Sequence, residues 1–289
     1  MTASSAEDVP VEKQEITIPM EATQENQELR RFFRTIAESS ENTLLLDFDG
    51  TLAPFRRDPT KVKPWAGVPA LLNQIQQIGK TRIVLVSGRP AQNVAAQIAL
   101  TAPLEAWGLH GSEHLLLDGT LECEKLPLRQ QLLLNAAKTA ITETGHLHRS
   151  GPRLETKWNA VAVHWRGMAA HSIATVREKM IQLMQPIAVE GNFELLIFDG
   201  GIEMRSGRNK GDAVRLLLAQ MRAETPVAYL GDDLTDEHAF HAIEGRGLGV
   251  LVRRQWRPTA AHLWIRPPAG LRFFLREWLQ AVQHTYSAG

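Results

Sequence analysis

Four short segments of this sequence are almost wholly apolar, and stretches with helical spacing lie between them along the chain. The apolar segments cover residues 43–48, 82–86, 226–230 and 247–252. Uniformly apolar strands are typical of buried parallel sheets, and strands that alternate with helices are joined by crossover connections. The sequence therefore predicts an α/β fold whose core is a parallel sheet.

Helical spacing of apolar residues predicts helices around these strands. Apolar positions such as Leu29, Phe33 and Ile36 recur at the period of a helix, which predicts a helix over residues 27–38. The residues before this helix are polar, acidic and weakly patterned. We therefore expect residues 1–26 to form a disordered tail.

The pattern of the chain changes between residues 122 and 202. Segment 160–165 alternates in polarity, and residues 194–203 have the pattern of a hairpin. Such alternation is typical of an antiparallel sheet with one exposed face. We interpret residues 122–202 as an inserted α+β cap domain, which divides the core domain into residues 27–121 and 203–289.

The composition is that of a soluble globular protein, with 44% hydrophobic and 22% charged residues among 289. Because 32 basic and 32 acidic residues balance, we expect no binding to nucleic acid, which usually needs a basic surface. We expect no membrane association, since the chain has no signal-peptide pattern and no apolar run of about 18 residues. The single cysteine, Cys123, permits no internal disulfide and suits a reducing cytoplasm.

Three of the apolar segments run directly into polar side chains. Asp47 lies at the end of the first segment and Asp49 directly after it, Ser87 follows the second, and Asp232 with Asp233 follow the third. In an open parallel sheet, ligands bind at the carboxyl ends of the strands. We therefore expect these side chains to converge at one edge of the sheet, although they are far apart in the sequence.

Lys210, at the start of a predicted helix, and Asp236 complete this set. Crowded carboxylates repel one another unless a cation neutralises them, and hard oxygen ligands suit Mg²⁺. Together with a lysine and a hydroxyl, such a site suits phosphoryl transfer in which a carboxylate attacks phosphorus to form an aspartyl-phosphate. A second acid must protonate the leaving oxygen and later activate water, and Asp47 and Asp49 can divide these roles.

The stretches DFDGTL (residues 47–52) and GDDLTDE (residues 231–237), with a hydroxyl after the second strand and a downstream lysine, resemble the four motifs of the haloacid dehalogenase (HAD) superfamily of phosphatases. The resemblance implies a HAD-like Rossmannoid core. It also implies that Asp47 is the nucleophile and Asp49 the general acid/base. Ser87 and Lys210 would hold the phosphoryl group.

The same resemblance implies how Mg²⁺ is bound. Asp47, the backbone carbonyl of Asp49 and Asp232 would be its ligands. Asp233 or Asp236 would support the site. Magnesium is therefore the expected cofactor.

Further stretches narrow the resemblance. The place of the insert, together with LHGSE, ETK, VHWR, EMR and GDDLTDEHAF, is similar to the trehalose-6-phosphate phosphatase family, which has a C2-type cap. Where we expect lysine–proline in that family, this chain has Arg205-Ser206, and arginine has a different donor geometry from lysine. The residues that the resemblance assigns to substrate binding are Arg89, Glu113, Glu155, Lys157, His164, Glu203 and Arg205.

The resemblance implies a Mg²⁺-dependent phosphatase that acts on trehalose 6-phosphate in trehalose biosynthesis, and the single cysteine leads us to expect it in the cytoplasm. Two alternatives stay open. One is the same chemistry on another sugar phosphate, such as sucrose phosphate or a glycosylglycerate phosphate, because the core motifs do not distinguish these substrates. The other is a non-catalytic sugar-phosphate sensor. The chain is too short to add a glycosyltransferase domain, so a trehalose-6-phosphate synthase would be a separate polypeptide.

Overall fold

The structure is a computed structural model that describes residues 24–56, 61–145, 151–198 and 200–283. Internal contacts divide the chain into two units. We call residues 1–122 with 209–289 the core unit, and residues 123–208 the cap unit. The assignment of these units to a catalytic domain and a cap domain stays a prediction.

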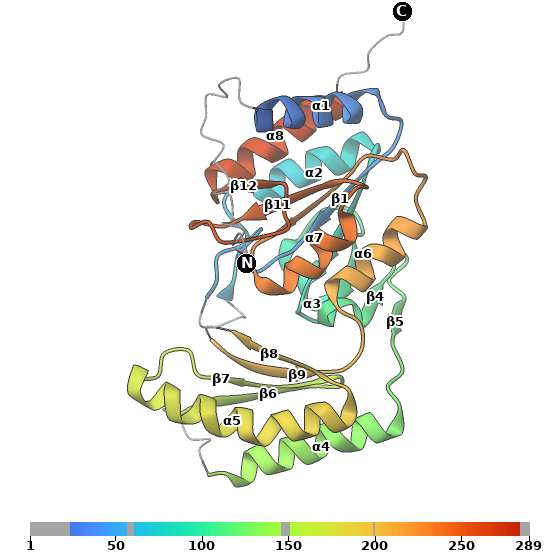
Figure 1. Cartoon of the computed structure of the whole chain (residues 1–289). Helices are drawn as coiled ribbons and strands as arrows, with labels where there is room; N and C mark the ends of the chain where they lie inside the picture. Colours follow the sequence, from blue (N-terminus) through green and yellow to red (C-terminus); the bar gives the residue numbers. More distant parts are fainter. Residues whose placement is uncertain (1–23, 57–60, 146–150, 199, 284–289) are drawn as a thin grey trace, which may run out of the picture. The chain divides into compact units, whose positions relative to one another are not determined.

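The core unit is built on a sheet of eight described strands (Figure 1), in the order β12-β11-β10-β1-β2-β3-β4-β5. Strands β12 to β3 pair in parallel, which confirms the predicted sheet, whereas β4 pairs antiparallel with β3. The short strands β4, β5 and β12 were not predicted. The strands are β1 (Asn42–Leu46), β2 (Thr81–Val86), β3 (Glu105–Gly108), β4 (Glu113–Leu115), β5 (Leu121–Cys123), β10 (Val227–Gly231), β11 (Leu248–Val252) and β12 (Leu263–Ile265).

Helices cover both faces of this sheet (Figure 1). Successive side chains of a strand point to opposite faces, so Leu44 and Leu46 pack in the hydrophobic core beneath α1, α2, α3 and α8, and Leu45 packs against α6 and α7. This two-sided burial is why β1 is apolar throughout. The helices are α1 (Gln24–Glu38), α2 (Val68–Ile78), α3 (Ala91–Ile98), α6 (Lys210–Ala219), α7 (Glu237–Ile243) and α8 (Ala269–Gln283).

Most of the predicted tail, residues 1–26, lies outside the described residues, which begin at 24. Helix α1 begins at Gln24, three residues before the predicted start. Its buried side chains Leu29 and Ile36 join the core, and the ring of Phe32 lies 6.0 Å from that of Trp278 on α8. Of the described helices, none is long and apolar enough to cross a membrane.

The cap unit contains an antiparallel sheet in the order β6-β7-β9-β8, as predicted for the insert. Two helices cover one face of this sheet (Figure 1). Apolar side chains of that face, including Val163, Ile202 and Met204, pack against them. The opposite face carries the charged residues. The elements are β6 (Arg153–Lys157), β7 (Ala160–His164), β8 (Glu194–Phe198), β9 (Gly201–Arg205), α4 (Leu128–Glu143) and α5 (Ala170–Gly191).

The boundary of the cap unit differs from the expected one. The unit ends at Arg208 instead of Ile202. Strand β9 pairs with β7 and β8 over its whole length, so Glu203 and Arg205 belong to the cap unit, although the expected core segment 203–289 includes them.

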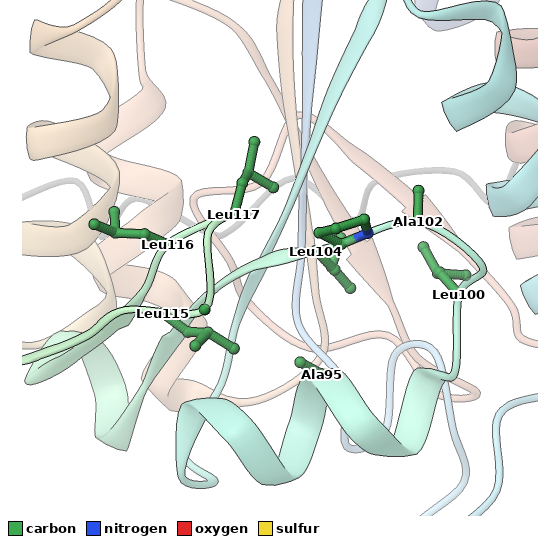
Figure 2. A pocket seen from close by; sticks show the side chains of 9 residues that line it. Ala95, Leu100, Ala102, Leu104, Leu115, Leu116 and Leu117 are labelled. Carbon is green, nitrogen blue, oxygen red and sulfur yellow. The ribbon is translucent and has the colours of Figure 1, made fainter.

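An apolar pocket of about 260 Å³ opens in the core unit (Figure 2). Leu104 precedes β3, and Leu115 ends the antiparallel β4, so the pocket lies at the amino end of β3. The carboxyl ends of the parallel strands, where the site residues were expected, are at the opposite edge. The pocket is lined by Ala95, Leu100, Ala102, Pro103, Leu104, Leu115, Leu116, Leu117 and Gly119.

Candidate active site

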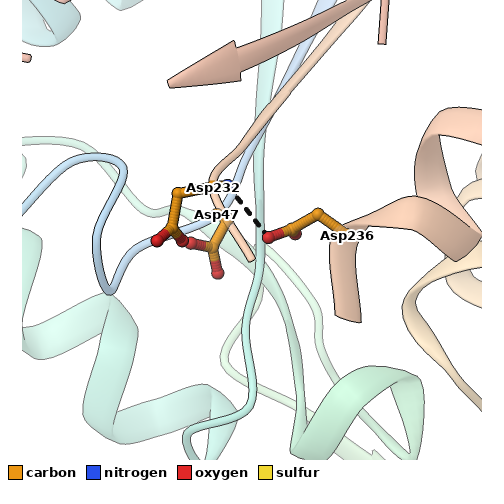
Figure 3. Close-up of side chains that lie close together, drawn as sticks. All are labelled: Asp47, Asp232 and Asp236. Atoms are coloured by element: carbon orange, nitrogen blue, oxygen red, sulfur yellow. Dashed lines mark hydrogen bonds between the residues drawn. The ribbon is translucent and has the colours of Figure 1, made fainter. Parts of the chain in front are cut away.

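Three carboxylates meet at the carboxyl edge of the core sheet. Strand β1 lies between β10 and β2, and Leu46 is in register with Leu230 and Leu85. Asp47 therefore leaves the sheet beside Asp232, and one carboxylate oxygen from each of Asp47, Asp232 and Asp236 lies within 4.8 Å of the others (Figure 3). The sheet topology thus brings together residues separated by nearly 190 positions.

Asp236 is held by donors of the protein on both of its carboxylate oxygens. Oδ1 accepts hydrogen bonds from Lys210 Nζ (2.8 Å) and the Tyr229 hydroxyl (2.5 Å). Oδ2 accepts from the backbone N–H groups of Asp232 (3.0 Å, Figure 3) and Asp233 (2.9 Å). A carboxylate offers about four lone-pair positions, so these four donors use its whole capacity. Asp236 therefore fixes the loop after β10 and the position of Lys210.

Lys210 is the first residue of α6, and Asn209 caps this helix with a reciprocal pair of bonds to Asp212. Its Nζ donates to Asp47 Oδ1 over 2.7 Å, and the residue is only 3% exposed. Burial alone would lower the pKa of Lys210, but the carboxylates of Asp236 and Asp47 outweigh it and raise the pKa. Lys210 is therefore a permanent buried cation beside Asp47.

The positive charge of Lys210 does not balance the negative charge of the carboxylates at this edge. Burial raises the pKa of Asp47 from 3.8 to about 7, because Lys210 offsets the penalty only in part and Asp236 adds repulsion. Burial, followed by repulsion from Asp47 and Asp236, raises the pKa of Asp232 well above its usual range. Oδ1 of Asp232 is buried and has no hydrogen-bond partner among the described residues. A divalent cation bound between Asp47 and Asp232 fits this surplus of negative charge.

Gly50 makes room for this arrangement. It has a φ of +88°, and a Cβ atom at this position would lie 2.1 Å from Oδ2 of Asp232. The loop after β1 can therefore approach Asp232 only with glycine here. Thr51, which is fully buried, donates from its hydroxyl to Asp47 Oδ2 over 3.0 Å and fixes the second oxygen of that carboxylate.

The other predicted residues of the core have different contacts. Ser87 is buried at the carboxyl end of β2, next to β1, and its Oγ accepts from the N–H of Arg89 (3.2 Å). Both oxygens of Asp49 accept from the guanidinium of Arg89. Asp233 caps the short turn after β10 by accepting from Leu234 N–H. The side chains of Asp49 and Asp233 thus lie outside the cluster of three aspartates.

Glu113 also has a local partner. Its Oε2 accepts from the N–H of Ala91 at the start of α3, over 2.9 Å, and the residue is 7% exposed. An acidic side chain at a helix N-terminus stabilises the helix. The predicted substrate ligand therefore anchors α3 in this structure.

Four of the substrate-binding candidates form one polar cluster in the cap unit. Glu155, Lys157, His164 and Glu203 lie on the face of the sheet that points away from α4 and α5. Nζ of Lys157 lies 3.0 Å from Glu203 and 3.8 Å from Glu155, and His164 Nε2 lies 2.7 Å from Glu155. The hydrogen bond of His164 lowers the pKa of Glu155, partly against burial, with help from Lys157.

Arg205, on the same face, is buried and pairs within the cap unit with Glu194, whose side chain is partly exposed. Its Nε and Nη2 donate to Glu194 Oε2 over 2.8 and 2.6 Å, whereas its buried Nη1 has no hydrogen-bond partner among the described residues. The next residue, Ser206, donates its N–H to Asn159 and its hydroxyl to Gln130. Proline has neither an N–H nor a hydroxyl, so Ser206 makes two hydrogen bonds that proline at this position could not make.

Some contributors to the site were not predicted. The Tyr229 hydroxyl holds Asp236, and Arg257 Nη2 donates to the backbone carbonyl of Asp233 over 2.7 Å. Tyr229 could have been found from the sequence, because it carries the one hydroxyl in the apolar segment 226–230. The contact of Arg257 spans 24 positions between two loops, and no local pattern indicates it.

Comparison with known proteins shows which proteins this chain is similar to. The family profile described as trehalose-phosphatase matches residues 45–262. A trehalose-phosphate phosphatase from Mycobacterium ulcerans is 29% identical over 237 residues, which are 80% of this chain and 60% of the relative. The chain thus spans about 60% of the length of that curated relative.

Solved structures show the same fold. The C-terminal domain of a Candida albicans trehalose-6-phosphate phosphatase superimposes with a TM-score of 0.71 at 21% identity, covering 88% of this chain and 96% of that one. A phosphatase of the haloalkanoate (HAD) superfamily from Bacteroides thetaiotaomicron gives a TM-score of 0.58 at 15% identity, covering 82% and 95%. These likenesses confirm the predicted HAD-like fold. The match over residues 45–262 shows that the chain belongs to the trehalose-phosphatase family.

Proposed function

We propose that this chain is a Mg²⁺-dependent phosphatase that hydrolyses trehalose 6-phosphate to trehalose and phosphate through an aspartyl-phosphate. Membership of the trehalose-phosphatase family supports the substrate. The observation that carries the chemistry is the contact between Lys210 Nζ and Asp47 Oδ1, 2.7 Å apart and buried beside Asp232. A lysine and a carboxylate with a place for a cation are what phosphoryl transfer requires.

Asp47 is the proposed nucleophile. Lys210 and Thr51 hold its two oxygens, which fixes the direction of attack. In the first half-reaction a bond forms from Asp47 to phosphorus, the bond from phosphorus to the sugar oxygen breaks, and Asp49 gives a proton to that oxygen. In the second, Asp49 takes a proton from water, whose oxygen bonds to phosphorus as the bond to Asp47 breaks.

Asp47, Asp232 and the backbone carbonyl of Asp49 are the proposed ligands of Mg²⁺. The unpartnered oxygen of Asp232 supports this ligand set, as does the raised pKa of both carboxyl groups. When bound, the ion would neutralise charge on the phosphoryl oxygens and keep Asp47 ionised. Asp236, whose oxygens already have protein donors, supports the site through Lys210. Asp233 supports it by shaping the loop.

The proposed sugar-binding residues of the cap unit are Glu155, Lys157, His164, Glu203 and Arg205. Sugar hydroxyls are donors and acceptors, and the mixed cluster of two carboxylates, a lysine and a histidine offers partners for both. Buried hydroxyls without partners would cost binding energy, so such a cluster suits a disaccharide. A separate synthase that makes the substrate is the proposed functional partner.

A phosphate-release panel tests the proposal. Purified chain with Mg²⁺ is given trehalose 6-phosphate, sucrose 6-phosphate and glucosylglycerate phosphate at equal concentrations, and kcat/KM is measured for each. We expect trehalose 6-phosphate to be the preferred substrate. A higher kcat/KM for either other compound would refute the substrate, and saturable binding without phosphate release would refute the enzyme in favour of a sensor.

A further inference from the structure

Arg89 and Asp49 form a two-point pair in the core unit. Nε of Arg89 lies 2.5 Å from Asp49 Oδ2, and Nη2 lies 2.6 Å from Oδ1. Each carboxylate oxygen therefore accepts from its own guanidinium nitrogen. Because the guanidinium and the carboxylate are both planar, two parallel bonds fix the orientation of Asp49 as well as its position.

The guanidinium is itself fixed by its surroundings. Nη1 of Arg89 donates to Gln97 Oε1 on α3 over 2.8 Å, and the guanidinium carbon lies 5.3 Å from the centre of the Phe48 ring. The side chain of Arg89 is 15% exposed and that of Asp49 26%. A pair held in this way differs from a solvated surface ion pair, which orients little.

We propose that Arg89 is a positioning residue that acts through Asp49 and does not bind the sugar, contrary to the role expected from the sequence. The inference rests on the proposed function, in which Asp49 is the acid and base. Two of its nitrogens donate to Asp49, the proposed acid and base, and a third donates to Gln97, which holds the guanidinium in place.

A double-mutant cycle tests this role with the full chain at saturating Mg²⁺. The variants are Arg89→Lys, Asp49→Asn and the double variant, with kcat and KM measured on trehalose 6-phosphate. Lysine keeps the charge but cannot make two parallel bonds. We expect Arg89→Lys to lower kcat about 10- to 100-fold, part of the 10²–10⁴ that positioned proton transfer contributes, with KM within about threefold of the wild type. In the Asp49→Asn background, Arg89→Lys should have no further effect beyond about twofold.

Arg82→Lys is the matched control. Arg82 also makes two bonds to a carboxylate of the core unit, Glu105, over 2.8 Å each, but it lies near the start of β2, away from Ser87. Its kcat should stay within about twofold of the wild type, as expected for a pair without a role in proton transfer. Circular dichroism and a urea midpoint verify that each variant is folded.

The possible outcomes separate the inference from the proposed function. Losses that multiply in the double variant, or a raised KM with unchanged kcat for Arg89→Lys, would show that Arg89 contacts the substrate and would overturn the inference alone. A folded wild type that releases no phosphate from any sugar phosphate would overturn the proposed function and the inference with it.

Discussion

The ammonium nitrogen of Lys210 lies between two buried carboxylates, 2.7 Å from Asp47 and 2.8 Å from Asp236. The three residues are each at most 3% exposed. Removing one charge from such a group leaves the others uncompensated in a medium of low polarity. The same contacts that are proposed to direct catalysis therefore also support the native state.

Replacing Lys210 with methionine should affect both activity and stability. The variant keeps most of the side-chain volume but leaves Asp47 and Asp236 without their cation, so we expect the free energy of unfolding to fall by about 3–5 kcal/mol. Phosphatase activity should fall with it. Urea denaturation measures the first effect, and phosphate release, at a temperature where the variant is folded, measures the second. Lys138→Met, on the exposed side of α4, should change neither.

Asp47→Asn should abolish turnover while the fold persists. When EDTA keeps the protein free of metal, the free energy of unfolding of this variant should also depend less on pH than that of the wild type. The pKa of Asp47 is raised to about 7 in the native state, so its contribution to the free energy of unfolding is full below about pH 4 and is lost as the pH rises through 7. The melting temperature of the wild type should therefore fall more steeply than that of Asp47→Asn over this range. Equal slopes would contradict the raised pKa.

Removal of Mg²⁺ should abolish phosphatase activity, and adding Mg²⁺ back should restore it. A ligand that binds only the native state stabilises that state, by about 2.7 kcal/mol at a ligand concentration 100-fold above Kd. Mg²⁺ should thus raise the melting temperature of the wild type, but much less that of Asp232→Asn, which lacks the unpartnered carboxylate oxygen. Differential scanning fluorimetry across a Mg²⁺ titration measures this. Full turnover in EDTA would refute the metal requirement.

Gly50→Ala should damage the metal site more than an equivalent change elsewhere. Its Cβ would overlap Asp232 Oδ2, 2.1 Å away, in addition to the strain of a positive φ. Gly79→Ala is the control, because Gly79 also has a positive φ (+78°) but has open space around the new Cβ. We expect the control to lose about 1–3 kcal/mol of stability from backbone strain and to keep its affinity for Mg²⁺. Gly50→Ala should lose that affinity, measured by calorimetry.

Glu203→Gln should weaken binding of the sugar without changing the chemical step. Hydrogen bonds to charged groups contribute about 1.5–3 kcal/mol, so we expect KM for trehalose 6-phosphate to rise about 10-fold or more. The kcat for p-nitrophenyl phosphate, which has no sugar, should stay near the wild-type value. Glu190→Gln, an exposed residue of the same unit paired only loosely with Arg129, should leave both substrates unaffected. Equal losses on the two substrates would indicate damage outside sugar binding.

Much of the core unit could be predicted, because the burial of its strands is visible in short stretches of the sequence. The three leucines of β1 are buried on both faces of the sheet. A strand that is buried on both faces has a continuous run of apolar residues, which can be recognised in the sequence. The parallel sheet in turn predicted that Asp47 and Asp232 would meet, since adjacent parallel strands end at one edge. Short strands such as β4 and β12 carry too few residues to show a period, so they escaped prediction.

The sequence by itself thus determined the class of fold, the family, and the set of charged residues that gather at one sheet edge. Only the tertiary structure decided which partner each of them takes. Asp236 accepts from four donors, Glu113 accepts from the N–H of Ala91 at the start of α3, and Arg89 donates two bonds to Asp49. A motif specifies residue types along one dimension. The partner of a buried charge depends on which atoms other strands and helices bring within about 3 Å, because a hydrogen bond needs that distance and direction.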